Sequence, residues 1–312
     1  MPVIRTSKAM QMHHDHNDDH DLGLAHDLAR LGQQAIERRA ALRWLMGAGA
    51  MSLGGAGALT LAACGGGGSD SATSSTSSSS GSSGSTSSSG GTTTTTSGCS
   101  VIPSETEGPY PGDGSNSANG SIANVLALSG VVRSDIRSSI AGASGTATGV
   151  PLQVIIELVN TSASCADLAG YAIYLWHCDA LGRYSMYSSG VTGENYLRGV
   201  QATGSDGTAV FQTIYPGCYA GRVPHIHFEV YRSTTTATNW NNKLRTSQLC
   251  FPSDANTAVY ATSGYGSSAA NNNAISLSSD GIFSDGYATQ LATVTGSVSA
   301  GYVARLKVGI SA

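Results

Sequence analysis

Short runs of β-branched and aromatic residues, separated by turn-forming Gly, Asn, Asp and Ser, recur along residues 100–312. Such runs predict β-strands, which we place at 126–132, 150–159, 172–177, 200–203, 209–214, 224–231 and 302–310. Long helical periodicity is absent from the sequence after Ala63. Many short strands with Gly-rich turns predict an all-β domain, a sandwich or a barrel, and we take a β-sandwich as the expected fold.

The connections between these runs carry signals of their own. Asp206-Gly207 is a dipeptide typical of a tight hairpin turn, so it favours a hairpin between the strands at 200–203 and 209–214. Two long polar stretches, 233–245 and 263–281, are interpreted as surface loops.

Residues 1–63 resemble an export signal. The pair Arg38-Arg39 is followed by an uncharged stretch rich in Ala, Gly and Leu over 44–63, a pattern typical of a twin-arginine signal. Residues 61–64 then resemble a bacterial lipobox, in which Cys64 is lipidated and becomes the new N-terminus. A transmembrane anchor is the alternative, and the small residues and terminal cysteine disfavour it. We therefore expect an exported protein, a periplasmic or cell-envelope lipoprotein with lipid on Cys64.

The rest of the chain divides into two parts. Residues 64–98 consist almost entirely of Gly, Ser and Thr, a composition with too little apolar area to offset its ordering entropy, so a flexible linker is predicted. Residues 99–312 are long enough for one domain with a full core.

Charge narrows the range of partners. Sixteen Lys and Arg face 20 Asp and Glu, a formal net charge of −4, and no basic cluster or amphipathic helix stands out after the signal. Nucleic acid is therefore not an expected partner. The oligomeric state is left open.

Five cysteines follow the lipobox, at 99, 165, 178, 218 and 250. An oxidising compartment permits disulfides, and the odd number leaves at least one thiol unpaired within the chain. We expect Cys165 to pair with Cys178 and Cys218 with Cys250. Buried free thiols are the alternative interpretation.

The main candidate for chemistry is the stretch 219–227, Tyr-Ala-Gly-Arg-Val-Pro-His-Ile-His. On a strand, His225 and His227 project from one face and can share a metal ion, with Tyr219 reaching in from the preceding loop. Arg222 adds a fixed positive charge that we place at the rim, where a surface ion pair is the alternative. A His-x-His pair alone serves zinc, copper or no metal. His177, the third histidine after Ala63, is interpreted as structural and hydrogen-bonded near the site.

Four motifs resemble the intradiol ring-cleavage dioxygenases, the family of protocatechuate and catechol dioxygenases that hold non-haem Fe(III). The motifs run in chain order as 106–110 (Thr-Glu-Gly-Pro-Tyr), 176–184 (Trp-His through Gly-Arg-Tyr), 213–219 (Thr-Ile-Tyr-Pro-Gly-Cys-Tyr) and 222–228 (Arg-Val-Pro-His-Ile-His-Phe). The resemblance extends from about residue 104 to about residue 252.

The resemblance implies a set of site residues. Its four metal ligands fall on Tyr184, Tyr219, His225 and His227. It also implies that Arg222 faces the aromatic ring, that Gln248 is the active-site glutamine and that Tyr110 lines the substrate site. Hard phenolate oxygens suit Fe(III), which explains why the family uses two tyrosines.

The expected reaction is cleavage of a catechol-type aromatic by O₂ to a muconate-type dicarboxylate. Tyr219 is expected to take a proton from the diol, and Arg222 to stabilise negative charge that develops on the substrate. Two alternatives come from other classes: a lipid-anchored β-sandwich binding module without turnover, and a zinc or copper hydrolase that uses the His-x-His pair. The sequence leaves the ring substituent open between catechol, protocatechuate and hydroxyquinol.

Overall fold

A computed structural model describes residues 99–312 of the chain. The predicted twin-arginine signal, the lipidated Cys64 and the 64–98 linker lie outside the described residues. Within 99–312, no helix is both long enough and apolar enough to cross a membrane.

The first sheet is built around β3 and β11, which run parallel from Leu152 opposite Tyr302 to Asn160 opposite Ile310. β10 extends the sheet beyond β11, while β7 and β4 both pair with the other edge of β3, at different points along it. The bounds are β3 (Pro151–Asn160), β4 (Ala166–Asp167), β7 (Thr208–Ile214), β10 (Thr293–Ser297) and β11 (Gly301–Ile310).

The second sheet is fully antiparallel, in the order β6-β5-β8-β9. A separate two-stranded hairpin, β1–β2, precedes both sheets in the chain. The bounds are β1 (Asp113–Ala118), β2 (Ser121–Asn124), β5 (Ala172–Trp176), β6 (Arg198–Ala202), β8 (His225–Tyr231) and β9 (Lys243–Cys250).

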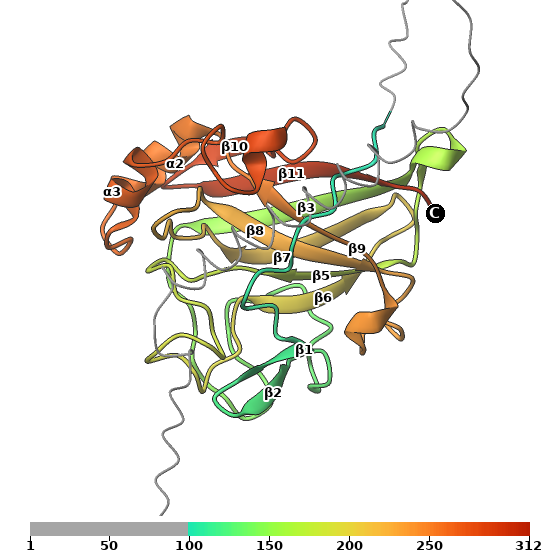
Figure 1. The fold of residues 1–312 in the computed structure, drawn as a ribbon, viewed down its shortest axis with the longest axis horizontal. Helices are drawn as coiled ribbons and strands as arrows, with labels where there is room; N and C mark the ends of the chain where they lie inside the picture. The colour runs from blue at the N-terminus through green and yellow to red at the C-terminus, as the bar shows by residue number, and fades with distance from the viewer. Residues whose placement is uncertain (1–98) are drawn as a thin grey trace, which may run out of the picture. The chain divides into compact units, whose positions relative to one another are not determined.

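The two sheets face each other across the main hydrophobic core, which confirms the predicted all-β sandwich (Figure 1). Alternate residues point inward: Ile226 and Phe228 of β8 are fully buried in the same cluster as Ile156 of β3 and Phe211 of β7. The period of two along a strand therefore sends the remaining residues of β8, including both histidines, to the outer face of the second sheet.

The outer face of the second sheet carries a second buried cluster, which includes Tyr174, Trp176 and Tyr184. Residues from the N-terminal part of the domain, Val125, Leu126 and Val131, cover it. Both faces of this sheet are thus shielded, and polar side chains on the outer face lie in a largely apolar environment.

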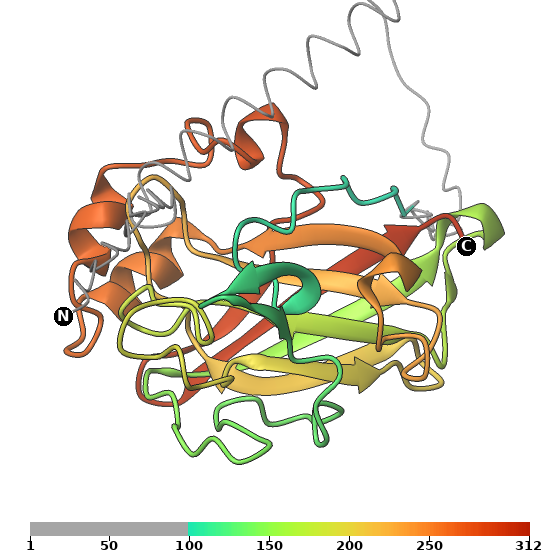
Figure 2. The ribbon, with the colours of Figure 1, turned by 60° about the horizontal axis from the view of Figure 1, so that its bottom comes forward.

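The α-helices of the described residues are short and lie between β9 and β10. Figures 1 and 2 show α2 (Ser253–Tyr260) and α3 (Ser268–Asn273) together at one end of the strands. Single-turn 3₁₀ helices lie at Thr161–Ala163, Trp240–Asn242 and Phe283–Asp285. The stretch 263–281, predicted as a loop, therefore contains a short helix, and the predicted loop 233–245 contains the start of β9.

Two strand predictions are wrong. The hairpin at Asp206-Gly207 does not form, because β6 pairs with β5 in one sheet while β7 pairs with β3 in the other. The turn itself is present, with the Gly204 N–H donating to the Thr208 carbonyl at 2.8 Å; it carries the chain between sheets. The run 126–132 forms turns with a single bridge at Val132 rather than a strand, because its apolar residues cover the second sheet.

The predicted cysteine pairs are also wrong. Cys99 is bonded to Cys165, with 5.7 Å between their Cα atoms. Val101 pairs with Gly309 near the end of β11, and β11 is the neighbour of β3. Because Cys165 follows β3 in the chain, Cys99 and Cys165 lie close enough to form the disulfide. Cys178, Cys218 and Cys250 are buried free thiols, the alternative that the sequence left open.

Candidate active site

His225 and His227 begin β8 on its outer face, 1% and 3% exposed. Their Nε2 atoms lie 3.1 Å apart. The His227 ring stacks on Trp176, its partner in the register between β5 and β8, with centroids 4.9 Å apart and planes at 10°. Neighbouring strands therefore fix the orientation of this imidazole.

Two tyrosines reach the histidines from loops. Tyr184 follows β5, and Tyr219 lies in the connection from β7 to β8. The two loops pack closely at glycines: a Cβ on Gly217 would meet the carbonyl oxygens of Ala180 and Asp179 at 2.7 and 2.8 Å. A side chain at Gly217 would separate the loops and move the tyrosines apart.

The four side chains converge at their polar atoms. The Tyr184 Oη atom lies 3.4 Å from the Tyr219 Oη, 3.4 Å from His225 Nε2 and 3.3 Å from His227 Nε2. Tyr219 Oη lies 3.0 Å from His225 Nε2. The structure thus brings together all four residues that the resemblance named as ligands.

This donor set fits a metal ion. Neighbouring ligands about 2.1 Å from one ion lie roughly 3.0–3.4 Å from each other in octahedral or tetrahedral geometry, which is the range found here. His225 Nδ1 lies 2.6 Å from the Val223 carbonyl oxygen. Because that oxygen only accepts, Nδ1 carries the proton and Nε2 keeps its lone pair for a metal.

The site is unusual in its composition. Within residues 99–312, no three His, Cys, Asp or Glu side chains gather so as to hold a metal ion. In the candidate site, the phenol oxygens of Tyr184 and Tyr219 join the two imidazoles in the positions where carboxylates or thiolates commonly bind a metal. Anionic oxygen donors of this kind favour hard, highly charged cations.

Burial governs the protonation of these groups. It lowers the pKa values of His225 and His227 well below the usual range, so both imidazoles are neutral, the form that binds metals. It raises the pKa values of Tyr184 and Tyr219, and the neighbouring phenol adds to the rise at Tyr184. A cation held between the two phenols would reverse that effect and favour their phenolate forms.

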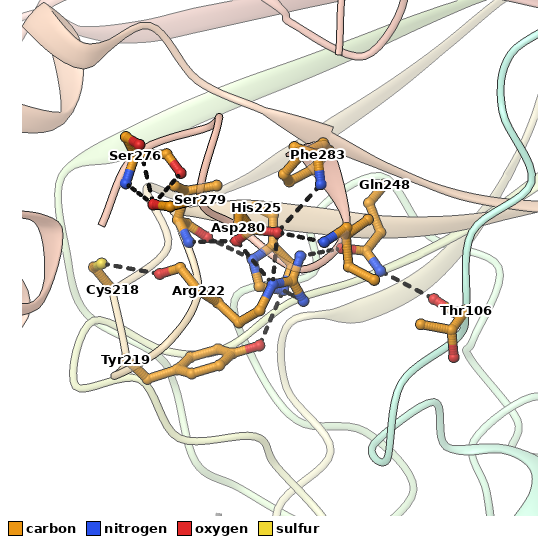
Figure 3. Close-up of polar contacts among 12 residues, drawn as sticks. Thr106, Cys218, Tyr219, Arg222, His225, Gln248, Ser276, Ser279, Asp280 and Phe283 are labelled. Atoms are coloured by element: carbon orange, nitrogen blue, oxygen red, sulfur yellow. Dashed lines mark hydrogen bonds and ion pairs between the residues drawn. The ribbon is translucent and has the colours of Figure 1, made fainter. Parts of the chain in front are cut away.

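Arg222 is not at the rim, contrary to the sequence interpretation. It is 8% exposed, and its Nη1 lies 3.5 Å from His225 Nε2 while its Nη2 donates to Gln248 Oε1 at 2.7 Å (Figure 3). Burial disfavours its cation, but Tyr219 and Asp280 outweigh that effect and raise its pKa. Arg222 is therefore a buried, permanent charge directed at the ligand cluster.

Gln248 and Tyr110 also lie at the site. Gln248 is fully buried on β9 and donates through Nε2 to the Thr106 carbonyl oxygen at 3.0 Å. The half-buried Tyr110 ring lies 5.0 Å from the Tyr184 ring, centroid to centroid. His177 stands apart, with Nε2 2.7 Å from Thr213 Oγ1 and Nδ1 2.8 Å from the Cys178 carbonyl oxygen, as expected for a structural histidine.

One residue at the site was missed from the sequence. Asp280 is fully buried and forms an ion pair with Arg222, with the Arg222 Nε 2.9 Å from its Oδ2. It sits in the polar stretch that the sequence predicted as a surface loop. The available signal was a single acidic residue flanked by apolar Leu277, Ile282 and Phe283.

The chain is similar to one protein-family model and to several solved structures. Residues 135–263 match the family model described as "Dioxygenase". No curated protein sequence matches the chain. Among solved structures, an intradiol ring-cleavage dioxygenase from Tetranychus urticae is 24% identical, with 68% of this chain and 95% of that chain covered and a TM-score of 0.51.

Two further structures are similar. The crystal structure of another dioxygenase is 23% identical, covers 68% of this chain and 94% of its own, and has a TM-score of 0.51. The dioxygenase domain of a dioxygenase–carbohydrate-binding protein fusion from Streptomyces sp. SirexAA-E is 23% identical over 68% of this chain and 98% of its own, with a TM-score of 0.41.

The first two structures share the fold, and the family model spans the loops and strands that carry Tyr184, Tyr219, His225 and His227. The resemblance that the sequence motifs predicted is thereby confirmed: residues 135–263 match the family model, and the described domain has the fold of an intradiol ring-cleavage dioxygenase.

Proposed function

We propose that this domain uses non-haem Fe(III), held by Tyr184, Tyr219, His225 and His227, to cleave a catechol-type aromatic with O₂. The bond broken is the one between the two hydroxyl-bearing carbons, and both oxygen atoms enter a muconate-type dicarboxylate. The observation that carries the proposal is the convergence of two phenol oxygens and two imidazole nitrogens within 3.0–3.4 Å of their neighbours.

When bound, ferric iron would act as a Lewis acid that lowers the pKa values of the diol hydroxyls, and the deprotonated ring is more electron-rich toward O₂ than the neutral diol. Tyr219 is suited to proton transfer, because it is the more exposed of the two tyrosines. As a phenolate it accepts a proton from one diol hydroxyl. Tyr184, 2% exposed, is shielded from solvent and keeps its place in the ligand set.

Arg222 and Gln248 act on charge and orientation. The Arg222 guanidinium, directed toward His225 Nε2, stabilises negative charge that develops on the substrate during ring attack. Gln248 holds Arg222 through Nη2 and joins it to the Thr106 carbonyl of the N-terminal segment. The Tyr110 ring, beside Tyr184, offers an apolar surface to the aromatic substrate.

The test is turnover by the iron-loaded chain. Catechol, protocatechuate and hydroxyquinol are supplied separately, while O₂ uptake is followed and the product is identified as a ring-opened dicarboxylic acid. Tyr219→Phe is expected to lose at least about 10²-fold in kcat, because it removes both an anionic donor and a proton acceptor. Tyr302→Phe, a buried tyrosine of β11 in the opposite sheet, is the matched control and keeps full activity.

Visible absorption separates the alternatives. Ferric phenolates absorb strongly in the visible range, so an iron-loaded chain is coloured and Tyr219→Phe changes its spectrum. A colourless chain that takes up zinc and hydrolyses esters would contradict the proposal. So would a coloured chain that binds catechol without consuming O₂.

We further propose that the protein is exported as a lipoprotein. The Cys99–Cys165 disulfide supports export, because disulfides persist in oxidising compartments. Replacing Arg38 and Arg39 by lysine is expected to retain the protein in the cytoplasm, and Cys64→Ser to release it from the membrane fraction. Cell fractionation measures both, and an unchanged distribution in both variants would contradict the proposal.

A further inference from the structure

Asp280 makes an unusual number of contacts for one carboxylate. Its Oδ2 accepts from the Val223 N–H at 2.8 Å and from Arg222 Nε at 2.9 Å. Its Oδ1 accepts from the Ile282 N–H at 2.8 Å and the Phe283 N–H at 3.3 Å. Both oxygens are thus occupied by donors from two separate parts of the chain.

These contacts fix the Arg222 fork. Nε is held by Asp280 and Nη2 by Gln248 at 2.7 Å, which leaves Nη1 directed at His225 Nε2 at 3.5 Å (Figure 3). The Phe283 ring lies 5.8 Å from the guanidinium carbon. A planar guanidinium that is hydrogen-bonded at Nε and Nη2 has little freedom to rotate, so the direction of Nη1 is fixed.

The Asp280 carboxylate is held in place by its own loop. The Asp280 N–H donates to the Ser276 carbonyl at 2.9 Å, and the Ser284 N–H donates to the Asp280 carbonyl at 3.0 Å. The side chain is fully buried. The carboxylate is therefore a rigid reference point for Arg222, which is the condition for preorganisation.

We propose that Asp280 is a positioning residue that aims Arg222 at the reacting substrate. This inference rests on the proposed function and deepens it. Asp280 lies beyond the residues 135–263 that match the family model, so the C-terminal segment completes a site whose other members lie earlier in the chain. Without the carboxylate, Arg222 keeps its charge but loses the contact that fixes its direction.

A double-mutant cycle on the iron-loaded full chain tests the proposal. Arg222→Gln is expected to lower kcat by about 10²–10³-fold, and Asp280→Asn by about 10²-fold because the cation is displaced. The double variant should match Arg222→Gln within about threefold, because a residue that acts through Arg222 has no effect once Arg222 is gone. Iron content should be unchanged in all variants.

The matched control is the exposed pair of Asp135 and Arg137, whose side chains are 50% and 45% exposed. Asp135→Asn makes the same chemical change in an aspartate–arginine pair that is far more exposed than Asp280 and Arg222. This variant should leave kcat unchanged. Should Asp280→Asn fail to fold, Asp280→Glu keeps the charge and moves it by one methylene. Its loss of kcat should also disappear in the Arg222→Gln background.

Three results would overturn the proposal. In the first, Asp280→Asn lowers kcat by the same factor with and without Arg222, which indicates a general structural role. In the second, Asp280→Asn loses iron, which indicates that Asp280 acts through the His225 segment instead. In the third, Asp280→Asn retains wild-type kcat.

The affinity for 4-nitrocatechol tests the positioning role of Asp280 without requiring that the chain cleave a diol. If the wild-type chain cleaves no diol, the proposed function fails, and the same cycle is read from the Kd of 4-nitrocatechol by absorbance. Asp280→Asn should weaken binding about tenfold when Arg222 is present, and not at all in the Arg222→Gln background. Equal weakening in both backgrounds overturns the positioning role alone.

Discussion

Two buried arginines flank the four converging side chains, and they are satisfied in opposite ways. Arg222 shares its charge with the Asp280 carboxylate. Arg198 is fully buried, and no carboxylate of the described residues forms an ion pair with it. All of its donors go to neutral oxygens: Ser185 Oγ, the Pro111, Tyr110 and Ser185 carbonyls, and the Tyr174 hydroxyl, at 2.7–3.2 Å.

The difference shows what each arginine is for. All the hydrogen bonds of Arg198 anchor neighbouring parts of the chain, and those of Nη2 join the segment that carries Tyr110 to the turn that follows Tyr184. Arg222 uses only part of its fork for anchoring and keeps one corner facing the ligand cluster. The first side chain is used for the geometry of its donors, and the second for the direction of its charge.

The largest expected effect comes from Arg198→Met. The Ser185 and Tyr110 carbonyls lose the donors of Arg198, and the Pro111 carbonyl keeps only the Tyr174 hydroxyl. At about 1–3 kcal/mol for each lost partner, the free energy of unfolding should fall by about 4 kcal/mol. Arg198→Lys should recover little of it, because an ammonium cannot reproduce the five-donor fork. Urea unfolding of both variants measures this. Recovery to wild-type stability with lysine would show that charge, not donor geometry, matters at Arg198.

At Arg222, in contrast to Arg198, the positive charge should matter more than the geometry of the donors. Arg222→Gln is expected to lose about 3–4 kcal/mol of transition-state stabilisation. Arg222→Lys retains the charge and should lose only about tenfold in kcat, roughly 1.4 kcal/mol. Steady-state kinetics with the preferred diol compares the two. Equal losses in both variants would place Arg222 in the same class as Arg198.

The smallest effect concerns pH. Burial, with a contribution from the Arg198 cation, lowers the pKa of His177 from 6.5 to about 4. Because the unfolded chain binds the proton more tightly, the stability due to neutral His177 is present above pH 6.5 and is lost as the pH falls toward 4. The total change is about 3 kcal/mol.

His177→Gln removes this dependence, so unfolding free energies of wild type and variant should converge by about 3 kcal/mol on acidification from pH 7 to 4. In Arg198→Met the pKa of His177 rises, and the acid-dependent loss should be smaller than in wild type. A pH-independent difference between wild type and His177→Gln would contradict a neutral, buried His177.

Local pattern was sufficient to predict the strands that position the histidines. The alternation in β8 places Ile226 and Phe228 in the core and thereby His225 and His227 together on the other face, as the sequence indicated. The β1–β2 hairpin and β10 escaped prediction because their Ser, Asn, Thr and Gly residues lack that alternation. The domain boundaries and the region before residue 99 stay predictions.

Long-range partners were not accessible in the same way. The spacing of cysteines does not reveal that Cys99 and Cys165 meet through neighbouring strand ends. The Asp206-Gly207 turn is local, and whether its flanking strands pair depends on the two sheets. The rim position predicted for Arg222 is wrong because its charge partner, Asp280, lies 58 residues further along the chain and buries it.

The disulfide has a mechanical consequence for the domain. A pull on the chain ahead of Cys99 is transmitted through sulfur to Cys165 and so into β3, whose ladders with β11 and β7 lie along most of its length. Force that passes through the disulfide does not pass through the segment from Thr106 to Tyr110. Tension at the start of the domain therefore does not peel away the backbone to which Gln248 is fastened.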